Sequence, residues 1–360
     1  MMLYVKKQML KKFVQRVFMK VGLNSDDASL AADVLVQADY SGVESHGIAR
    51  LVQFVTRIQK GAINKKPKIT QINDSENLVS LNGDNGSGIV VGPNALKLCI
   101  ERAKRFGISC VTINNSNHYG VGNYYAWKFA KADLIGITMT NTSPCIAPFG
   151  GIEKLFGTNP LTIAIPANEH YPIILDMATS KVAYGQIERR AIENQKIPLD
   201  WAIDEKGNPT DDPVEALKGS LLHFGSYKGY GIALVIDLLS SVLAQASYGK
   251  GLGNVNDLED PKPEKIGHFM MAIDISKFQP IDHFKDEVDK YIDSIKTSKK
   301  APGIEEIFVP GEIEFLKAEQ NAIKGIGITE NMGKILLDLA IELDMAAEGE
   351  RTDSLLQKYS

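Results

Sequence analysis

Two side chains near the amino end of the chain carry the most informative chemistry, His46 and Arg50. Apolar residues at positions 51, 54, 55 and 58 predict a helix from Ile48 onward, which would place positions 46 and 50 on one face. A histidine exchanges a proton near neutral pH, and an arginine binds a carboxylate through two parallel hydrogen bonds. The pair suits a substrate with an alcohol or ketone beside an acid group. Taken alone, the spacing is also explained by a solvated His and Arg at a helix entrance.

A second group surrounds His118, which stands among Asn and Ser donors directly after a candidate strand at 108–113. Loops at strand ends commonly carry the reactive groups of α/β enzymes. Gly120 and Gly122 permit close approach of the backbone to a bound molecule. The pattern suits proton transfer or recognition of a substrate carbonyl. In isolation, a turn with a structural histidine explains it equally well.

Three further segments have the composition of site loops. Residues 156–160 form a polar turn before a strand, and 175–180 place Asp176 beside two hydroxyls. Lys228 stands at a predicted helix start, where backbone N–H groups and the helix dipole favour anions. Each segment is also explained as a simple turn, with Asp176 as a helix cap and Lys228 as an exposed charge.

Common nucleotide-binding and hydrolase fingerprints are absent. Gly120-x-Gly122 is followed by Tyr125 where the dinucleotide fingerprint requires a small residue, and no acidic residue closes a following strand at the expected distance. No Walker loop, His-Glu-x-x-His or Gly-x-Ser-x-Gly motif occurs. The six histidines show no ligand spacing, so the sequence predicts no metal site.

The secondary structure that positions these groups is predicted to be helical first and then mixed, with strands and helices, further along the chain. Apolar spacing is helical from about residue 6 to 60, and residues 61–68 predict a linker. Beyond it, short β-branched runs predict strands at 78–81, 108–113, 134–139, 161–165, 173–175 and 268–275. Helices are predicted at 93–106, 122–132 and 230–247, a surface loop at 249–265, and further helix after 311. This alternation indicates an α/β layer structure.

Bulk composition narrows the possible partners and location. The 360 residues are 44% hydrophobic and 23% charged, with a net charge of −4 and no basic tract, so we expect no nucleic-acid partner. No apolar run is long enough for a membrane span, and we expect no membrane association. Three cysteines without a Cys-x-x-Cys pair fit a reducing compartment, so we expect a cytoplasmic protein.

Taken together, these segments resemble the malate/L-lactate dehydrogenase family, which also contains sulfolactate, ureidoglycolate and diketogulonate dehydrogenases. The motifs follow the family's order over nearly the whole chain, and such a set is specific for the family but not for one substrate. The matching residues are Ser45–Gly47 with Arg50, Asn115 and Ser116 with His118 and Gly120, Pro148–Gly151, Gly157–Pro160, Asp176–Ser180, Pro198 with Trp201 and Asp204, Tyr227–Gly231, and Pro310–Glu312.

The resemblance implies an α/β fold with a non-Rossmann mixed sheet, and a helical domain built from both chain ends. We expect that discontinuous helical domain at 1–70 and 312–360, with the α/β cofactor- and substrate-binding domain at 71–311. It also implies a homodimer that uses NAD, or NADP, to oxidise a 2-hydroxy acid. Malate or lactate is the default substrate and ureidoglycolate the alternative, while a catalytically silent binding protein is the alternative from another class.

Roles carried over from the family cover three sets of residues. The resemblance implies that His46 and His118 are the acid/base candidates. It implies substrate contacts at Ser45, Arg50, Thr142 and Asn159. It implies cofactor contacts at His118, Gly120, Asp176, Met177, Ala178, Thr179, Ser180, Tyr227, Lys228, His268, Phe269, Met270, Pro310, Gly311 and Glu312. His223 replaces the family's usual proline near this last set, so the choice between NAD and NADP stays open.

Overall fold

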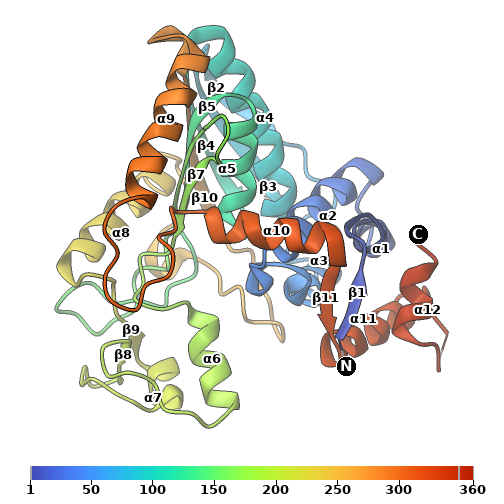
Figure 1. Ribbon diagram of the computed structural model, residues 1–360. Coiled ribbons are helices and arrows are strands. Elements are labelled where there is room, and N and C mark those ends of the chain that lie inside the picture. Colours follow the sequence, from blue (N-terminus) through green and yellow to red (C-terminus); the bar gives the residue numbers. More distant parts are fainter. Residues whose placement is uncertain (1, 348, 360) are drawn as a thin grey trace.

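A seven-stranded mixed sheet forms the centre of the molecule (Figure 1). The computed structural model describes residues 2–347 and 349–359. The strands lie in the order β2 (Thr70–Ser75), β3 (Leu78–Gly86), β4 (Ile108–Ser116), β10 (Ile266–Asp274), β5 (Leu134–Thr140), β6 (Leu161–Ile165) and β7 (Ile173–Met177). Only the β3–β4 pair within this sheet is parallel. The predicted α/β fold with a mixed sheet is therefore confirmed.

Strand register places one group of loops along a single edge of this sheet. Ser116, at the end of β4, pairs with the start of β10, and Thr140, at the end of β5, pairs with His268 near that start. Leu161, at the start of β6, pairs with the end of β5 and with Met177 at the end of β7. The loops that carry residues 117–121, 141–160 and 178–180 therefore leave from the same edge.

Helices cover both faces of the sheet. α4 (Gly88–Phe106) and α5 (Gly122–Lys131) pack on one face, against β4, β10, β5 and β6. Gly136 in β5 is required there, because a Cβ at this position would lie 2.1 Å from Cγ of Phe129. α8 (Tyr227–Ser240) packs against β10 and β5, and the side chain of Asn159 donates to its Ala233 carbonyl. The longer helix predicted to residue 247 ends at Ser240, because residues 241–245 form turns in which Gln245 has a positive φ of 60°.

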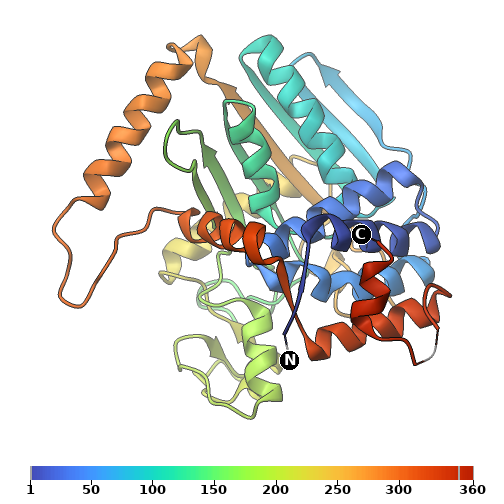
Figure 2. The ribbon, with the colours of Figure 1, turned by 45° about the vertical axis from the view of Figure 1, so that its right-hand side comes forward.

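Both ends of the chain contribute to one helical region, as Figure 2 shows. Its elements are α1 (Lys7–Lys20), α2 (Ser25–Tyr40), α3 (Leu51–Gln59), α10 (Glu312–Lys324), α11 (Glu330–Glu342) and α12 (Thr352–Gln357). Strand β1 (Met2–Val5) pairs antiparallel with β11 (Ile326–Thr329) and joins the two ends. The apolar stripe of α1, including Phe13 and Phe18, is fully buried. The domain limits at 70 and 312 stay a prediction.

A small unit below the sheet was not predicted. It contains α6 (Tyr184–Ile192), α7 (Pro213–Lys218) and the short pair β8 (Ala202–Ile203) and β9 (Ser220–Leu221), around a separate apolar cluster that includes Ile146, Phe156 and Ile187. Asp212 caps α7 by accepting from Val214 N at 2.8 Å. The remaining helix, α9 (Ile281–Lys296), follows β10 in the chain and lies at the upper left of Figure 1, away from the helices of the two chain ends. None of the helices in the described part of the chain combines the length and apolarity needed to cross a membrane.

One local prediction was wrong. Residues 46 and 50 do not share a continuous helix, because two short 3-10 turns, Glu44–His46 and Ile48–Arg50, precede α3. Gly47 between them has ψ of −142°, which no helix accommodates. The apolar spacing used for the prediction belongs to α3 itself, which begins only at Leu51.

Candidate active site

The connection between α2 and α3 brings His46 against the sheet-edge loop that carries His118. Their rings are nearly parallel, with centroids 5.7 Å apart. Phe54 of α3 contacts the His118 ring at 6.3 Å between centroids. The two candidate histidines are 72 residues apart in the sequence, yet their rings lie side by side. Both residues are half-buried.

His46 is held by its sequence neighbour. Ser45 Oγ lies 3.0 Å from His46 Nδ1, which leaves Nε2 available for another partner. Burial, and to a smaller extent the positive charge of Arg50, lower the pKa of His46 to about 4. The ring is therefore neutral at pH 7. In the tautomer whose Nδ1–H donates to Ser45 Oγ, Nε2 carries a lone pair and can accept a proton from a substrate hydroxyl.

His118 has a different hydrogen-bonding environment. The Gly120 N–H donates to His118 Nδ1 at 3.2 Å, which places the ring proton of the neutral form on Nε2. Burial, and then the charges of His46 and Arg50, hold the pKa of His118 well below its usual range. In this tautomer Nε2 is a hydrogen-bond donor. His118 is therefore suited to bind a substrate oxygen.

Arg50 lies beside this pair and is fixed through its own turn. Its Nε donates to the Ser45 carbonyl at 2.8 Å. Among the described residues, nothing accepts a hydrogen bond from its two Nη groups. Gly185 of α6 lies next to them, since a Cβ added at this glycine would be 3.9 Å from Nη2. The half-exposed guanidinium can therefore receive an anion.

Asp39, a residue to which the sequence pattern assigned no role, shapes the turn that presents His46 and Arg50. Its carboxylate Oδ2 accepts from Ile48 N at 2.7 Å, and the side chain is 5% exposed. A Cβ at Gly47 would lie 2.2 Å from the carboxyl group, so only glycine fits there. Burial raises the pKa of Asp39 to about 8, with a smaller contribution from Glu44, while the hydrogen bond from Ile48 opposes this.

The raised pKa of Asp39 predicts a specific dependence of stability on pH. The folded protein holds this proton more tightly than the unfolded chain, whose carboxyl has a pKa near 3.8. Its contribution to the free energy of unfolding therefore falls as pH rises from about 4 towards 8. Asp39→Asn keeps an acceptor but cannot ionise, so it should lose less stability than the wild type between pH 5 and 8. Urea unfolding at both pH values measures the difference, and parallel losses would contradict the assignment.

The predicted substrate residues Thr142 and Asn159 form one unit at the same edge. Asn159 is fully buried with φ of 33°, and its Oδ1 accepts from Thr142 N at 3.2 Å. Thr158 N donates to Thr142 Oγ1 at 2.9 Å. The geometry makes Asn159 a support that orients the half-buried Thr142.

The segment Asp176–Ser180 leaves the end of β7 along this edge. The Asp176 carboxylate accepts from Asn123 N at 2.7 Å, at the start of α5, and from Thr162 Oγ1 at 2.8 Å. The contact with Asn123 ties the first turn of α5 to the end of β7, and residue 176 is exposed. Thr179 is buried and bonded to the Thr158 carbonyl, while half-buried Met177 and Ala178 lie between these anchors.

The other predicted cofactor segments lie in three places. Tyr227 and Lys228 are exposed at the start of α8, directly after Ser226 with its φ of 61°. Pro310–Glu312 lie along β7, where Ile174 N donates to the Pro310 carbonyl at 2.9 Å, and the Glu312 carboxylate binds Val309 N and Lys296. Gly120 and Gly122 are buried at the loop before α5.

His268, Phe269 and Met270 occupy the core of β10. The His268 side chain is fully buried, with Nδ1 2.8 Å from Thr140 Oγ1 and Nε2 2.8 Å from Ser116 Oγ. Its ring stacks on Tyr119 at 4.8 Å between centroids. These contacts hold β10 to its neighbours, and a role in cofactor binding stays a prediction.

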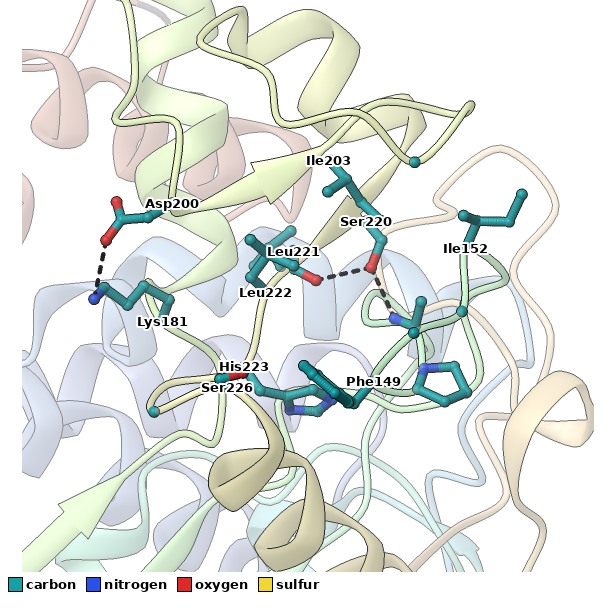
Figure 3. Close-up of a pocket in the computed structure, with 16 residues that line it drawn as sticks. Phe149, Ile152, Lys181, Asp200, Ile203, Ser220, Leu221, Leu222, His223 and Ser226 are labelled. Atoms are coloured by element: carbon teal, nitrogen blue, oxygen red, sulfur yellow. Dashed lines mark hydrogen bonds and ion pairs between the residues drawn. The ribbon is translucent and has the colours of Figure 1, made fainter.

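A pocket of about 550 Å³ adjoins two of the predicted cofactor segments (Figure 3). Lys181, next to Ser180, and Ser226, next to Tyr227, both line it, together with Phe149 and the His223 ring. Neither ring nitrogen of the buried His223 has a partner within hydrogen-bond distance in the described structure. Burial lowers the pKa of His223, and the nearby backbone of Thr179 and Ala147 opposes this. The pocket therefore contains an unsatisfied polar group beside apolar walls.

Two buried charges near His118 were also missed from sequence, Arg57 and Glu264. Each side chain is 1% exposed, and Glu264 Oε1 lies 3.4 Å from His118 N. The signal for Arg57 was present, because position 57 falls on the helical stripe formed by Phe54 and Ile58. Glu264 had no such signal, since it lies in a loop.

Similarity to known proteins agrees with this geometry. The family model described as malate/L-lactate dehydrogenase matches residues 5–336. A malate dehydrogenase of Pyrococcus abyssi is 41% identical over 344 residues, covering 93% of this chain and 94% of the relative. A ureidoglycolate dehydrogenase (NAD(+)) of Escherichia coli O157:H7 is 30% identical over 337 residues, covering 94% and 96%. The solved sulfolactate dehydrogenase of Methanocaldococcus jannaschii has a TM-score of 0.88 at 40% identity, covering 95% of this chain and 98% of that one. The chain therefore belongs to the malate/L-lactate dehydrogenase family, as its motifs predict.

Proposed function

We propose that the protein is an NAD(P)-dependent 2-hydroxyacid dehydrogenase, with malate or lactate as its substrate. The observation that carries this proposal is the pair of stacked imidazoles, His46 and His118, beside the unpaired Nη groups of Arg50. A 2-oxo acid has a carboxylate next to its reacting carbonyl. Arg50 can bind that carboxylate while the imidazoles meet the carbonyl oxygen.

The residues around the sheet edge fit a nicotinamide cofactor. The backbone N–H groups and Lys228 at the start of α8 suit the pyrophosphate. Ser180 Oγ and the His223 ring nitrogens are buried polar atoms without partners in the described structure, at or near the adjoining pocket. When bound, the nicotinamide supplies the hydride acceptor or donor. We favour NAD, with NADP possible.

Proton exchange is assigned to His46. Neutral His46 has Nε2 free to accept the proton of a substrate hydroxyl, and Ser45 Oγ steadies its other nitrogen. His118 carries its proton on Nε2 and donates a hydrogen bond to the same oxygen. In the direction of reduction, His46 must start protonated, and the carboxylate of the bound substrate offsets the charge of Arg50 that disfavours this form.

Two alternatives differ from this proposal, one in the substrate and one in the class of protein. Ureidoglycolate is the alternative substrate within the family, since it also has a carboxylate beside the reacting carbon. A silent binding protein is the alternative from another class, and the retention of His46, His118, Arg50 and Lys228 argues against it.

We propose a homodimer on the basis of α8. One face of this helix packs on the sheet, while apolar side chains on the other face and the following turn are exposed: Ile232, Leu234, Val235, Leu238, Val242 and Leu243. An apolar patch of this kind marks an association surface. Light scattering should give twice the mass of one chain, and Val235→Asp should give the mass of a monomer. A wild-type monomer would contradict the proposal.

We also propose a cytoplasmic location. The three cysteines are free, which fits this location, and cell fractionation tests it.

The activity is tested by the decrease in NADH or NADPH absorbance with a panel of 2-oxo acids that includes oxaloacetate and pyruvate. We expect reduction of at least one, unchanged by EDTA. No group of three His, Cys, Asp or Glu side chains suited to a metal occurs among residues 2–347 and 349–359. Loss of activity in EDTA with recovery on adding a divalent metal would contradict the metal-free mechanism. No turnover across the panel would contradict the proposed function.

A further inference from the structure

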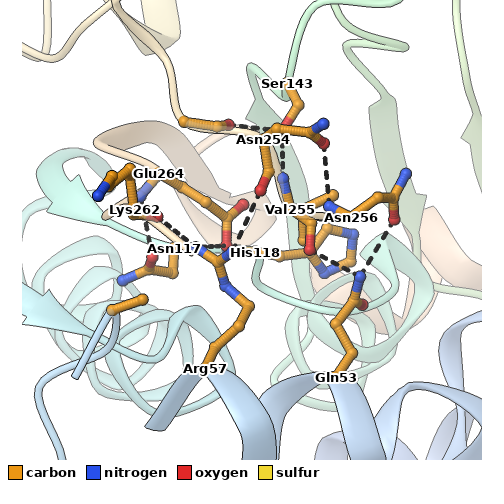
Figure 4. A network of polar contacts seen from close by, with 12 residues as sticks. Gln53, Arg57, Asn117, His118, Ser143, Asn254, Val255, Asn256, Lys262 and Glu264 are labelled. Atoms are coloured by element: carbon orange, nitrogen blue, oxygen red, sulfur yellow. Dashed lines mark hydrogen bonds and ion pairs between the residues drawn. The ribbon is translucent and has the colours of Figure 1, made fainter. Parts of the chain in front are cut away.

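The loop of residues 253–264 is closed on itself and attached to α3 (Figure 4). Gly253 N donates to the Glu264 carbonyl at 3.0 Å, which brings the two ends of the loop together. From α3, Gln53 Nε2 donates to the Val255 carbonyl at 2.9 Å, and Lys60, directly after α3, donates through Nζ to the Leu258 carbonyl at 2.8 Å. The sequence predicted only a surface loop here. The structure shows that it bridges the helical region and the sheet edge.

A buried ion pair lies at the centre of this attachment. Arg57 Nη2 is 3.5 Å from Glu264 Oε1, and it donates to the Lys262 carbonyl at 2.7 Å, while Nη1 donates to the Asn254 carbonyl at 3.1 Å. Arg57 Nε and Glu264 Oε2 are buried without partners in the described structure. The desolvation cost of two buried charges can exceed the gain from such incomplete pairing. The buried pair is therefore weak evidence for a role in stability alone.

The contacts of Glu264 lead directly to His118. Glu264 Oε1 accepts from His118 N at 3.4 Å, and Glu264 N donates to Asn117 Oδ1 at 3.2 Å. Nδ2 of the same Asn117 side chain donates to the Gly86 carbonyl at 2.9 Å. The peptide before the His118 ring is thus held from both sides. The same loop also contacts Ser143, whose Oγ accepts from Val255 N at 3.0 Å.

We propose that Glu264 and Arg57 are positioning residues, which fix the backbone of His118 and thereby aim its imidazole at the substrate oxygen. Arg57 supplies the charge that keeps the Glu264 carboxyl group in place, and Glu264 contacts the His118 peptide. This inference rests on the proposed dehydrogenase function. Neither residue touches the substrate in this arrangement, and the effect passes through the direction of the His118 ring.

The test compares three variants with the wild type. Glu264→Leu combined with Arg57→Met replaces both charges by apolar side chains of similar volume, and such a replacement of a buried ion pair is often neutral for folding. This double variant should fold and bind NADH within about twofold of wild type, yet lose at least about tenfold in kcat. Glu264→Gln keeps an oxygen acceptor for His118 N and should recover most of that loss. Gln53→Ala loosens the loop only at Val255 and Asn256, so it serves as the matched control and should keep kcat within about twofold.

A measurement independent of turnover accompanies the kinetics. Nitrogen NMR of labelled histidine should show the His118 Nε2–H tautomer in the wild type and in Glu264→Gln, and a mixture of tautomers in the double variant. A folded double variant with wild-type kcat and an unchanged His118 spectrum would overturn the inference while leaving the dehydrogenase function intact. An equal loss of kcat in Gln53→Ala would also overturn it, because the whole loop and not the ion pair would then be responsible. A wild-type protein without turnover contradicts the proposed function, and the NMR comparison still decides the positioning of His118.

Discussion

His46→Ala should lower kcat for reduction of the preferred 2-oxo acid by about a hundredfold or more, because removal of a general acid/base group typically has an effect of this size. His118→Ala should mainly raise KM, since we assign its Nε2–H to binding the substrate oxygen. The contrast follows from the two environments, in which Ser45 Oγ leaves His46 Nε2 free and Gly120 N fixes the tautomer of His118. Steady-state kinetics of both variants measure it.

The matched control for this pair is Ser45→Ala, which removes only the hydroxyl beside His46 Nδ1. It should reduce kcat less than His46→Ala does, and it should leave NADH binding unchanged. The reverse split, with His118→Ala losing kcat and His46→Ala losing only affinity, would exchange the two roles. Near-normal turnover in both histidine variants would show that neither transfers the proton.

Arg50→Ala should weaken capture of the 2-oxo acid by about ten- to a hundredfold or more. A charge-assisted contact with a carboxylate contributes about 1.5–3 kcal/mol. Arg50→Lys keeps the charge but lacks the planar pair of donors, so it should recover only part of the loss. The kcat/KM of both variants is measured together with NADH binding by fluorescence, which should not change. A surface arginine without a ligand would change kcat/KM very little, and that result would remove the proposed carboxylate anchor.

The sequence predicted the sheet and the two histidines because both depend on local patterns. Each predicted strand, from Leu78 to Ile275, is present, since β-branched runs between glycines are a local signal. The edge strands β1, β2 and β11 were missed. In β2 (Thr70–Ser75) every residue is exposed, so no apolar alternation marks it, and the four-residue strands β1 and β11 form only because the two chain ends meet.

The residues that hold the reactive side chains in position were harder to predict than the reactive side chains themselves. The Asp39 carboxyl group accepts a hydrogen bond from Ile48 N, nine residues later in the chain. Glu264 accepts one from His118 N, which is 146 residues away in the sequence. Neither relation leaves a spacing that can be recognised in one sequence. His46 and Arg50 were placed near each other for a wrong reason, since a glycine turn and not a shared helix face brings them together.

The pairing of β1 with β11 has a consequence for synthesis of the protein. The amino-terminal helices that present His46 and Arg50 are made early by the ribosome, but the strand partner of β1, Ile326–Thr329, follows β1 by more than 300 residues. A nascent chain that ends before Ile326 leaves β1 with an unpaired edge. The amino-terminal helices therefore reach their complete native arrangement only after residues 326–329 have been synthesised.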